Sequence, residues 1–344
     1  MIMVGCDFHP GWQQIAWLDT DTGANGLKKL IHSLGEAESF YRELPRPALV
    51  GLESTGNSHW FVDMVAALGH EVWVGDAAQV RASCVRRQKT DKRDAKHILN
   101  LLVEGRFPRI WVPTKDERDQ RQLLIHRCRL VAMRIRVKNE LQHLALDQGL
   151  QKNTRLWSRA GLDQLRQLPL KPWAGRRRDD LLGLRKVLDE QIRLLDRAVA
   201  EAAQGNHQAR LLMTQPGVGP VTSLAFVLIL GDVTRFHRGK QVASYLGLIP
   251  REFSSGGEQR LGPISKQGNQ FLRTLLVEAT RTAVRLDPDF RKQYEHCCCR
   301  RPSAVATVAA ARKLAIRLYW MLRTNTPYPE IARHEGSPRD PLIE

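Results

Sequence analysis

The sequence lacks a long apolar run. Its longest strongly apolar stretch, Leu224–Leu230, is far shorter than the roughly 20 residues that cross a bilayer. It begins without a basic segment followed by an apolar one, which argues against a secretory signal. No cysteines have the CxxC spacing of a structural zinc site, and three consecutive ones (Cys297–Cys299) are unlike a secreted disulfide framework. These absences predict a cytoplasmic protein with no membrane partner.

Charge of one sign dominates the chain. Lys and Arg total 53 against 36 Asp and Glu, a formal charge of +17 over 344 residues, while 42% apolar residues suffice for a sizeable core. Residues 1–80 carry a net −6, whereas residues 81–138 carry a net +11. Enzymes of nucleic acids combine metal-holding carboxylates with a basic surface that follows phosphates. A solvated basic helix beside an acidic domain would explain the same charges.

The first 104 residues predict a mixed α/β sheet. The strand order begins with three sequential strands and then alternates with helices, which is typical of a ribonuclease-H-like fold. Strands are expected at 2–8, 13–19, 28–34, 48–55 and 70–77, and helices at 36–44, 58–69 and 91–104.

The remainder predicts helices. Two long ones, within 123–144 and 181–204, joined by a polar, Pro-containing stretch over 168–180, indicate a helical hairpin or coiled coil that serves dimerisation or spacing. Its apolar seam includes Ile135, Leu184 and Val187. Further helices are expected at 222–231, 240–248, 268–284 and 303–323. The resulting units are 1–112, 113–206 and 207–325, followed by a loosely held tail over 326–344.

Four carboxylates are candidate metal ligands. Asp7 ends the first strand and Glu53 the fourth, while Asp91 and Asp94 are three residues apart at a helix start and share a face. Four hard oxygen donors suit Mg²⁺ or Mn²⁺. The structural alternative is that Asp91 and Asp94 only stabilise the helix start and that Asp7 is a turn residue.

Two glycine-containing loops are candidate nucleic-acid contacts. Gly217 and Gly219 precede a helix, as in the hairpin of helix-hairpin-helix motifs, and free backbone N–H groups there suit a phosphate. The Ser254-Ser255-Gly256-Gly257 loop is flanked by Arg260 and Lys266, so that a serine could attack a phosphodiester beside stabilising cations. A structural turn and an ordinary loop are the alternatives.

These features together resemble one family. The segments GCDFH, GLESTGNSHW, KTDKRDAKHIL, QPGVGPVTS and SYLGLIPREFSSGGEQRLGPISKQGN resemble the transposases of insertion-sequence family one hundred and ten, also called DEDD transposases or bridge-RNA-guided recombinases, over about residues 2–323. The resemblance implies a RuvC-like N-terminal domain with the catalytic, metal-binding tetrad Asp7, Glu53, Asp91 and Asp94. It also implies a C-terminal transposase domain with the catalytic serine Ser255. The chain departs from the family at His9–Gly11.

The same resemblance implies excision and integration of an insertion sequence, with a structured guide RNA that pairs with donor and target DNA. Ser255 would form a covalent DNA intermediate, in a site shared between subunits of a dimer that assembles to a tetramer near the nucleoid. A metal-dependent nuclease resembling a Holliday-junction resolvase, and a binding scaffold with an inert site, are the alternatives. Backbone contacts are expected from the basic residues Arg86, Arg87, Lys89, Arg127, Arg129, Arg134 and Arg136.

Overall fold

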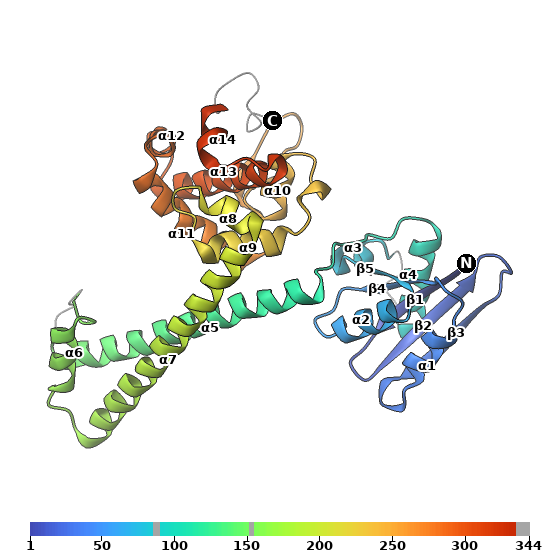
Figure 1. Ribbon diagram of the computed structural model, residues 1–344, viewed down its shortest axis with the longest axis horizontal. Helices are drawn as coiled ribbons and strands as arrows, with labels where there is room; N and C mark the ends of the chain where they lie inside the picture. Colours follow the sequence, from blue (N-terminus) through green and yellow to red (C-terminus); the bar gives the residue numbers. More distant parts are fainter. Residues whose placement is uncertain (85–89, 151–154, 335–344) are drawn as a thin grey trace. The chain divides into compact units, whose positions relative to one another are not determined.

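The computed structural model describes residues 1–84, 90–150 and 155–334. It divides the chain into two compact units, Met1–Val112 and Pro113–Glu344, which are drawn in Figure 1. In the parts of the chain that are described, no helix combines the length and apolar character needed to span a membrane.

A five-stranded sheet forms the centre of the first unit. The strand order is β3-β2-β1-β4-β5. Strands β1, β2 and β3 pair antiparallel, whereas β4 and β5 run parallel to β1. This mixed sheet confirms the predicted ribonuclease-H-like arrangement. The strand bounds are Ile2–Phe8 (β1), Trp12–Asp19 (β2), Asn25–Ile31 (β3), Leu49–Glu53 (β4) and Glu71–Gly75 (β5).

Helices cover both faces of this sheet. Because side chains alternate along a strand, Val4 and Cys6 pack on one face and Met3 on the other. Helices α1 (Glu36–Glu43) and α2 (His59–Ala67) cover the first face. Helices α3 (Ala77–Ala82) and α4 (Asp91–Val103) cover the second. Figure 1 shows α4 and α2 on opposite sides of the strands.

Two expectations for this unit need correction. The third strand begins earlier than predicted and ends at Ile31, because His32–Leu34 form a 3₁₀ turn (η1) that closes at Gly35 with φ of +70°. Helix α3 was not predicted. It follows directly after β5, and the Asp76 side chain caps it by accepting from the backbone N–H groups of Ala78 and Gln79.

Long helices α5 (Lys115–Asp147) and α7 (Pro172–Gly205) form an antiparallel hairpin, with α6 (Arg159–Arg166) between them. Their direction follows from the ion pairs, since Arg127 pairs with Asp196 at 2.5 Å and Arg177 with Glu140 at 3.1 Å. The expected linker at 168–180 is mostly helix, because Pro172 occupies the first turn of α7, where proline is tolerated.

The predicted apolar seam of this hairpin is only partly correct. Leu188 and Ile192 are buried between the helices. In contrast, Ile135, Leu184 and Val187 are 51%, 47% and 59% exposed. A single antiparallel partner covers only one stripe of each helix, so these three side chains face away from it.

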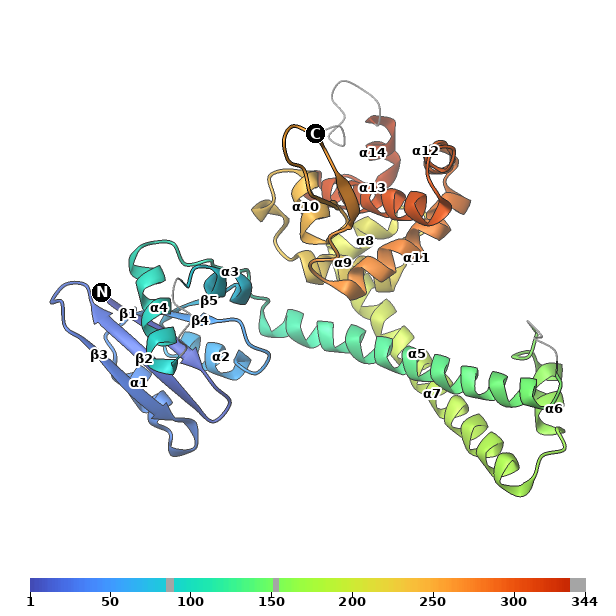
Figure 2. The ribbon, with the colours of Figure 1, turned by 180° about the vertical axis from the view of Figure 1, so that it is seen from behind.

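The rest of the second unit is a helical cluster around α9 (Pro220–Leu230), in which every residue from Thr222 to Leu230 is buried. Figure 2 shows α8, α10, α11 and α13 gathered around this helix. A helix that is apolar on all sides belongs in a core. The other elements are α8 (His207–Met213), η2 (Val233–Arg235), α10 (Gly239–Tyr245), β6 (Pro250–Glu252), β7 (Leu261–Ile264), α11 (Gln270–Leu286), α12 (Pro288–Cys298), α13 (Ser303–Thr324) and α14 (Tyr328–His334).

The segment expected to be a loose tail begins with an anchored helix. The Tyr328 hydroxyl donates to Asp287 Oδ2 at 2.7 Å, and Ile331 is buried. Asp287 also pairs with the buried Arg317 guanidinium at 3.3 Å. Helix α14 is therefore fixed to the core by a buried ion pair with a shared hydrogen bond. Residues 335–344 lie outside the described residues.

Candidate catalytic and nucleic-acid-binding sites

The sheet register aligns two of the predicted carboxylates. Strands β1 and β4 pair in parallel with Cys6 opposite Leu52, so Asp7 and Glu53, each one residue further, are level at the carboxyl ends of the strands. Residues two apart on a strand share a face. Gly5 and Gly51 face helix α4, and therefore Asp7 and Glu53 belong to the same face.

Glycine lets the helix that carries the other two carboxylates approach this face. A Cβ on Gly5 would lie 2.4 Å from both the Ala95 carbonyl oxygen and the Leu99 amide nitrogen of α4. Real side chains do not approach backbone atoms so closely, so only glycine permits this packing. The first turn of α4, which contains Asp91 and Asp94, is thereby held beside the end of β1.

Asp7, His9 and Asp91 form a compact cluster of candidate ligands. One donor atom of each lies within 4.8 Å of the others. His9 Nε2 is 3.4 Å from Asp7 Oδ2 and 3.7 Å from Asp91 Oδ1. The His9 ring stacks on Trp12 with centroids 4.2 Å apart, and Lys29 Nζ lies 4.1 Å from the Trp12 ring. This packing fixes the imidazole beside the carboxylates.

The pKa of Asp7 indicates that a bound cation would stabilise its ionised form. Burial raises the pKa of the Asp7 carboxyl above its ordinary value, His9 opposes this, and the charges of Asp94 and Asp91 raise the pKa further. Asp7 Oδ2 and His9 Nε2 are both buried, and apart from the long contacts of His9 with Asp7 and Asp91 neither atom has a partner among the described residues. Buried polar atoms normally have partners. Two carboxylates and one imidazole fit a divalent metal ion, and Mn²⁺ accepts such mixed oxygen and nitrogen donors.

Glu53 has a different environment from the other three carboxylates. Its Oε1 accepts from Arg81 Nη2 at 3.2 Å and lies outside the compact cluster. Asp94 is close enough to Asp7 to influence its pKa. The structure therefore brings Asp7 and Asp91 together with His9, keeps Asp94 nearby, and pairs Glu53 with a cation of α3. A tetrad including Glu53 stays a prediction.

Sequence reasoning missed His9 as a candidate ligand. The residue was noted only as part of a turn that departs from the family pattern. The available signal was its position two residues after Asp7, on a turn that returns the chain to β2. The His9 backbone N–H donates to the Trp12 carbonyl at 2.9 Å, and this bond closes the turn.

Ser255 lies at the tip of a hairpin that joins β6 to β7. The Glu258 N–H donates to the Ser255 carbonyl at 3.1 Å, and Gly256 and Gly257 between them have φ of +60° and +83°. Two consecutive positive φ angles are the pattern of a type I′ turn, which favours glycine. The expected flexible loop is therefore a defined hairpin, whose short strands were not predicted.

The two serines of this hairpin differ in their partners. The Ser254 hydroxyl donates to Glu252 Oε1 at 2.6 Å and accepts from the Arg260 N–H at 3.2 Å. The Ser255 hydroxyl is exposed and has no hydrogen-bond partner among the residues described. Ser254 thus stabilises the hairpin, while the Ser255 hydroxyl is available for chemistry.

The flanking cations also differ. Arg260 pairs with Glu258 at 2.7 Å, and both side chains are largely exposed. Lys266 has φ of +57°, a conformation that costs most L-residues about 1 kcal/mol or more and that glycine adopts freely. It lines a groove with Arg273, Gln270 and Thr274.

The Gly217 and Gly219 turn joins α8 to α9. Gly217 has φ of +87°, and a Cβ there would lie 2.5 Å from the Ala283 amide nitrogen of α11. This close packing is by itself a sufficient reason for glycine at this position. Gly219 is exposed at the N-terminus of α9, and a Cβ there would meet no atom within 4 Å. Only Gly219 leaves room for an incoming phosphate.

The predicted arginines of α5 fall into two pairs. Arg127 and Arg134 pair with Asp196 and Asp189 of α7. Arg129 and Arg136 are exposed and make no ion pair within the described parts of the chain. The predicted contacts Arg86, Arg87 and Lys89 lie outside the described residues.

Comparisons with known proteins agree with this arrangement. A profile described as "Transposase IS116/IS110/IS902 family" matches residues 209–295, and a DEDD-type IS110 profile described as "Transposase" matches residues 14–149. A "Probable family 20 transposase" of Pseudomonas aeruginosa is 33% identical over 304 residues, covering 85% of this chain and 89% of the relative.

Two further relatives are similar over most of their length. The transposase for insertion sequence element IS1328 of Yersinia enterocolitica is 29% identical, covering 81% of this chain and 84% of the relative. A pilin gene-inverting protein of Moraxella bovis is 28% identical, covering 80% of each chain. Because these matches cover 80–85% of this chain, each of them includes parts of both units.

Proposed function

The chain belongs to the IS116/IS110/IS902 family of transposases, and from this premise we propose that it exchanges DNA strands through a metal-dependent carboxylate site and a serine nucleophile, guided by a structured RNA. Cleavage and transfer of DNA strands are the family activity. The metal part of this proposal is supported chiefly by the buried donor atoms of Asp7 and His9, which lie beside each other and Asp91 and have no other partner among the described residues.

Metal binding is assigned to Asp7, His9 and Asp91, with Asp94 beside them and Glu53 level with Asp7 on the sheet. A bound divalent ion supplies charge neutralisation at a phosphate and activation of an attacking hydroxyl. The residues themselves orient the donors: Gly5 holds α4 against β1, and Trp12 holds the His9 ring. Arg81 pairs with Glu53 at the end of its strand.

Ser255 is proposed as the nucleophile. Its oxygen would form a bond to phosphorus while one bond from phosphorus to a deoxyribose oxygen breaks, and the freed deoxyribose oxygen takes a proton. A second deoxyribose hydroxyl then attacks the same phosphorus and releases the serine, so no external energy source is needed. The type I′ turn presents this hydroxyl at the hairpin tip, with Arg260 and Lys266 on the same hairpin and the loop after it.

The two serines provide a direct test of this assignment. Denatured cleavage reactions are expected to contain DNA covalently attached to protein in the wild type and in Ser254→Ala, though less in the latter because the hairpin loses two hydrogen bonds. The attachment should vanish in Ser255→Ala. In Ser255→Thr, which keeps a hydroxyl, a measurable fraction of the attachment should remain. Attachment that persists in Ser255→Ala would exclude Ser255.

Guide RNA and oligomer formation complete the proposal. The exposed cations Arg129 and Arg136 offer contacts for RNA or DNA backbones, and the exposed apolar side chains of the α5–α7 hairpin offer a surface for a second copy. Sequencing the nucleic acid that copurifies with the protein tests the RNA. One enriched structured RNA supports guidance, while a sample free of RNA that still recombines DNA refutes it.

The alternative of a Holliday-junction resolvase is less well supported. A resolvase needs only the carboxylates, whereas the family match over 209–295 and the serine hairpin belong to a second unit that such an enzyme does not require.

A further inference from the structure

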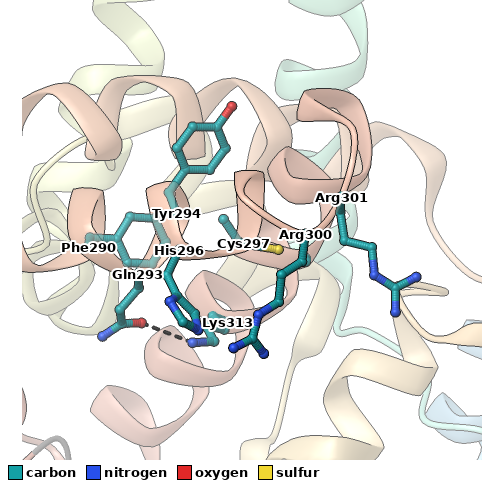
Figure 3. Close-up of a pocket in the computed structure, with 10 residues that line it drawn as sticks. Phe290, Gln293, Tyr294, His296, Cys297, Arg300, Arg301 and Lys313 are labelled. Carbon is teal, nitrogen blue, oxygen red and sulfur yellow. Dashed lines mark hydrogen bonds between the residues drawn. The ribbon is translucent and has the colours of Figure 1, made fainter.

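One pocket has no part in the proposed chemistry. It has a volume of about 320 Å³ and lies between α12, the loop that follows it, and α13. Phe290, Ala309 and Ala310 contribute an apolar lining. His296, Arg300 and Lys313 also line it, and in Figure 3 the ends of these three side chains lie on the same side of α12.

The charge around this pocket is of one sign. No Asp or Glu is among its lining residues. The Arg300 guanidinium makes no ion pair or hydrogen bond within the described residues, and Lys313 Nζ donates only to the neutral Gln293 Oε1 at 3.2 Å. Nearby exposed cations are neutralised differently, since Arg281 pairs with Glu278 and Lys292 with Asp289. The pocket thus concentrates positive charge that the protein itself does not balance.

The end of α12 explains this charge only in part. Cations near a helix C-terminus are favourable because they face the negative end of the helix dipole, which accounts for His296 and Arg300. Lys313 belongs to the interior of a different helix, α13, and stabilises no helix end. Its presence beside Arg300 above an apolar lining indicates a ligand with a negative charge and an apolar part.

We propose that this pocket binds one nucleotide unit of a nucleic-acid strand. The phosphate would lie between Arg300 and Lys313, which suit phosphate as a planar fork and a point charge, with His296 as a further donor. The sugar and base would lie against the apolar lining. A space of about 320 Å³ is an order of magnitude larger than one water requires, and it falls in the range of small-ligand pockets.

This proposal requires nucleic-acid binding by the family and is independent of the metal and serine chemistry. The proposed ligand group is the phosphodiester, which RNA and DNA share, so an RNA strand and a DNA strand both serve as probes. It also gives a role to the segment around Cys297–Arg301, which the sequence motifs leave unexplained.

Two variants of equal charge test it. Arg300→Gln/Lys313→Gln removes the two pocket cations, while Arg281→Gln/Lys292→Gln removes two exposed, internally paired cations of the same unit. Fluorescence anisotropy with a labelled RNA strand and a labelled DNA strand is measured against salt. The pocket variant is expected to lower the log–log salt slope by about 0.7 for a lost single-strand phosphate contact, and the control to leave it unchanged. Equal slopes for the two variants overturn the proposal.

Photocrosslinking locates the contact directly. Trypsin cleaves after Lys292 and Arg300, so the peptide Gln293–Arg300 reports on the pocket. Strands carrying 4-thiouridine or 4-thiothymidine are expected to crosslink to this peptide in the wild type and to the corresponding peptide 292–300 in the control variant, where Lys292→Gln leaves Arg291 as the preceding cleavage site. A crosslink with one strand type only identifies RNA or DNA as the ligand, and no crosslink with either overturns the proposal.

The failure of this proposal is distinguishable from that of the proposed function. If the wild type neither cleaves DNA with Mg²⁺ or Mn²⁺ nor attaches to it through Ser255, the catalytic proposal fails whatever the pocket binds. If cleavage at saturating DNA is normal in both charge variants and the salt slopes are equal, only the pocket proposal fails. Circular dichroism melts of both variants establish that they are folded.

Discussion

At the scale of single residues, Asp7 serves function at a cost to stability. Burial and the neighbouring charges of Asp94 and Asp91 raise its pKa in the folded state. The folded protein therefore holds this proton more tightly than the unfolded chain. Without metal, the contribution of Asp7 to the free energy of unfolding falls as pH rises from the ordinary aspartate pKa of about 3.9 through the raised pKa of the folded state. At neutral pH the ionised carboxylate is therefore destabilising.

We predict that Asp7→Asn raises the melting temperature at pH 7 in EDTA, because it removes that buried charge. The wild type should gain about 2.7 kcal/mol at a metal concentration 100 times the Kd, and Asp7→Asn should lose this gain. Differential scanning calorimetry with and without Mn²⁺ measures both.

Asp19 is a contrasting control, since hydrogen bonds from the Asp21 N–H and the Thr22 hydroxyl lower its pKa. Asp19→Asn should therefore lower stability and keep the metal response. A destabilised Asp7→Asn with a normal response would contradict the assignment.

Gly5 controls the distance between the strand and the helix that carry the carboxylates. We predict that Gly5→Ala costs about 1–3 kcal/mol of stability through overpacking against Ala95 and Leu99, and that it weakens Mn²⁺ binding because α4 must move away from Asp7. Chemical denaturation and calorimetric titration measure the two effects. Gly56→Ala, where the added Cβ meets no atom within 4 Å, should change neither. Unaltered metal affinity in a destabilised Gly5→Ala would mean that α4 does not position the site.

Some of this site could be predicted from the sequence and some could not. Asp7 and Glu53 end apolar runs and Asp91 and Asp94 begin a periodic helix, so parallel strand ends and helix spacing predict that the four converge. The structure brings Asp7 and Asp91 together and pairs Glu53 with Arg81. The role of His9 depends on how a three-residue turn folds back and on its stacking against Trp12, which no periodicity encodes. The distinction between Ser254 and Ser255 likewise depends on which hydroxyl the hairpin uses.

At the scale of elements, the arginines of α5 have two separable roles. We predict that Arg129→Gln/Arg136→Gln lowers the log–log salt slope of DNA binding by up to about 1.8, or about 0.9 per phosphate contact, and leaves the melting temperature unchanged. Arg127→Gln/Arg134→Gln should leave the slope unchanged and lower stability, by about 0.2–1 kcal/mol for each partly exposed ion pair. Anisotropy and thermal melts distinguish the pairs. Equal slopes for both variants would show that this face does not bind nucleic acid.

The elements that the sequence missed share a physical cause. Strands β6 and β7 span three and four residues, contain proline and glycine, and have no alternation, so only the Ser-Gly-Gly turn indicated them. Pro172 was interpreted as part of a linker, although proline is also favourable in the first turn of a helix. Helices α5, α9 and α13 were expected from the sequence, although Ile135 of the predicted seam on α5 is exposed.

At the scale of the whole molecule, the proposed reaction needs residues of two units. Asp7 belongs to Met1–Val112 and Ser255 to Pro113–Glu344, so the units must meet within one copy or between copies during catalysis. Ile135, Leu184 and Val187 are exposed apolar side chains on the helical hairpin, and we propose that a second copy packs against them. Arg134 pairs with Asp189, so Ile135 and Val187 lie at about the same level of the hairpin. A second copy packed there would bring both units of two chains into one assembly.

We predict that two inactive variants restore each other when mixed. Asp7→Ala lacks a metal ligand and Ser255→Ala lacks the nucleophile, but a mixed assembly contains an intact carboxylate cluster in one copy and an intact serine in another. Strand cleavage should return to a measurable fraction of the wild type if copies share sites, and the mixture should stay inactive if each copy acts alone. Adding Val187→Asp to both variants should abolish the restored cleavage, because a charge on the exposed apolar face opposes assembly, while the circular dichroism melt changes little. Adding Glu43→Gln to both instead, a change on an exposed residue of α1 on the opposite face of the sheet, should leave the restored cleavage intact. Restored cleavage that survives Val187→Asp would place the contact between copies on another surface.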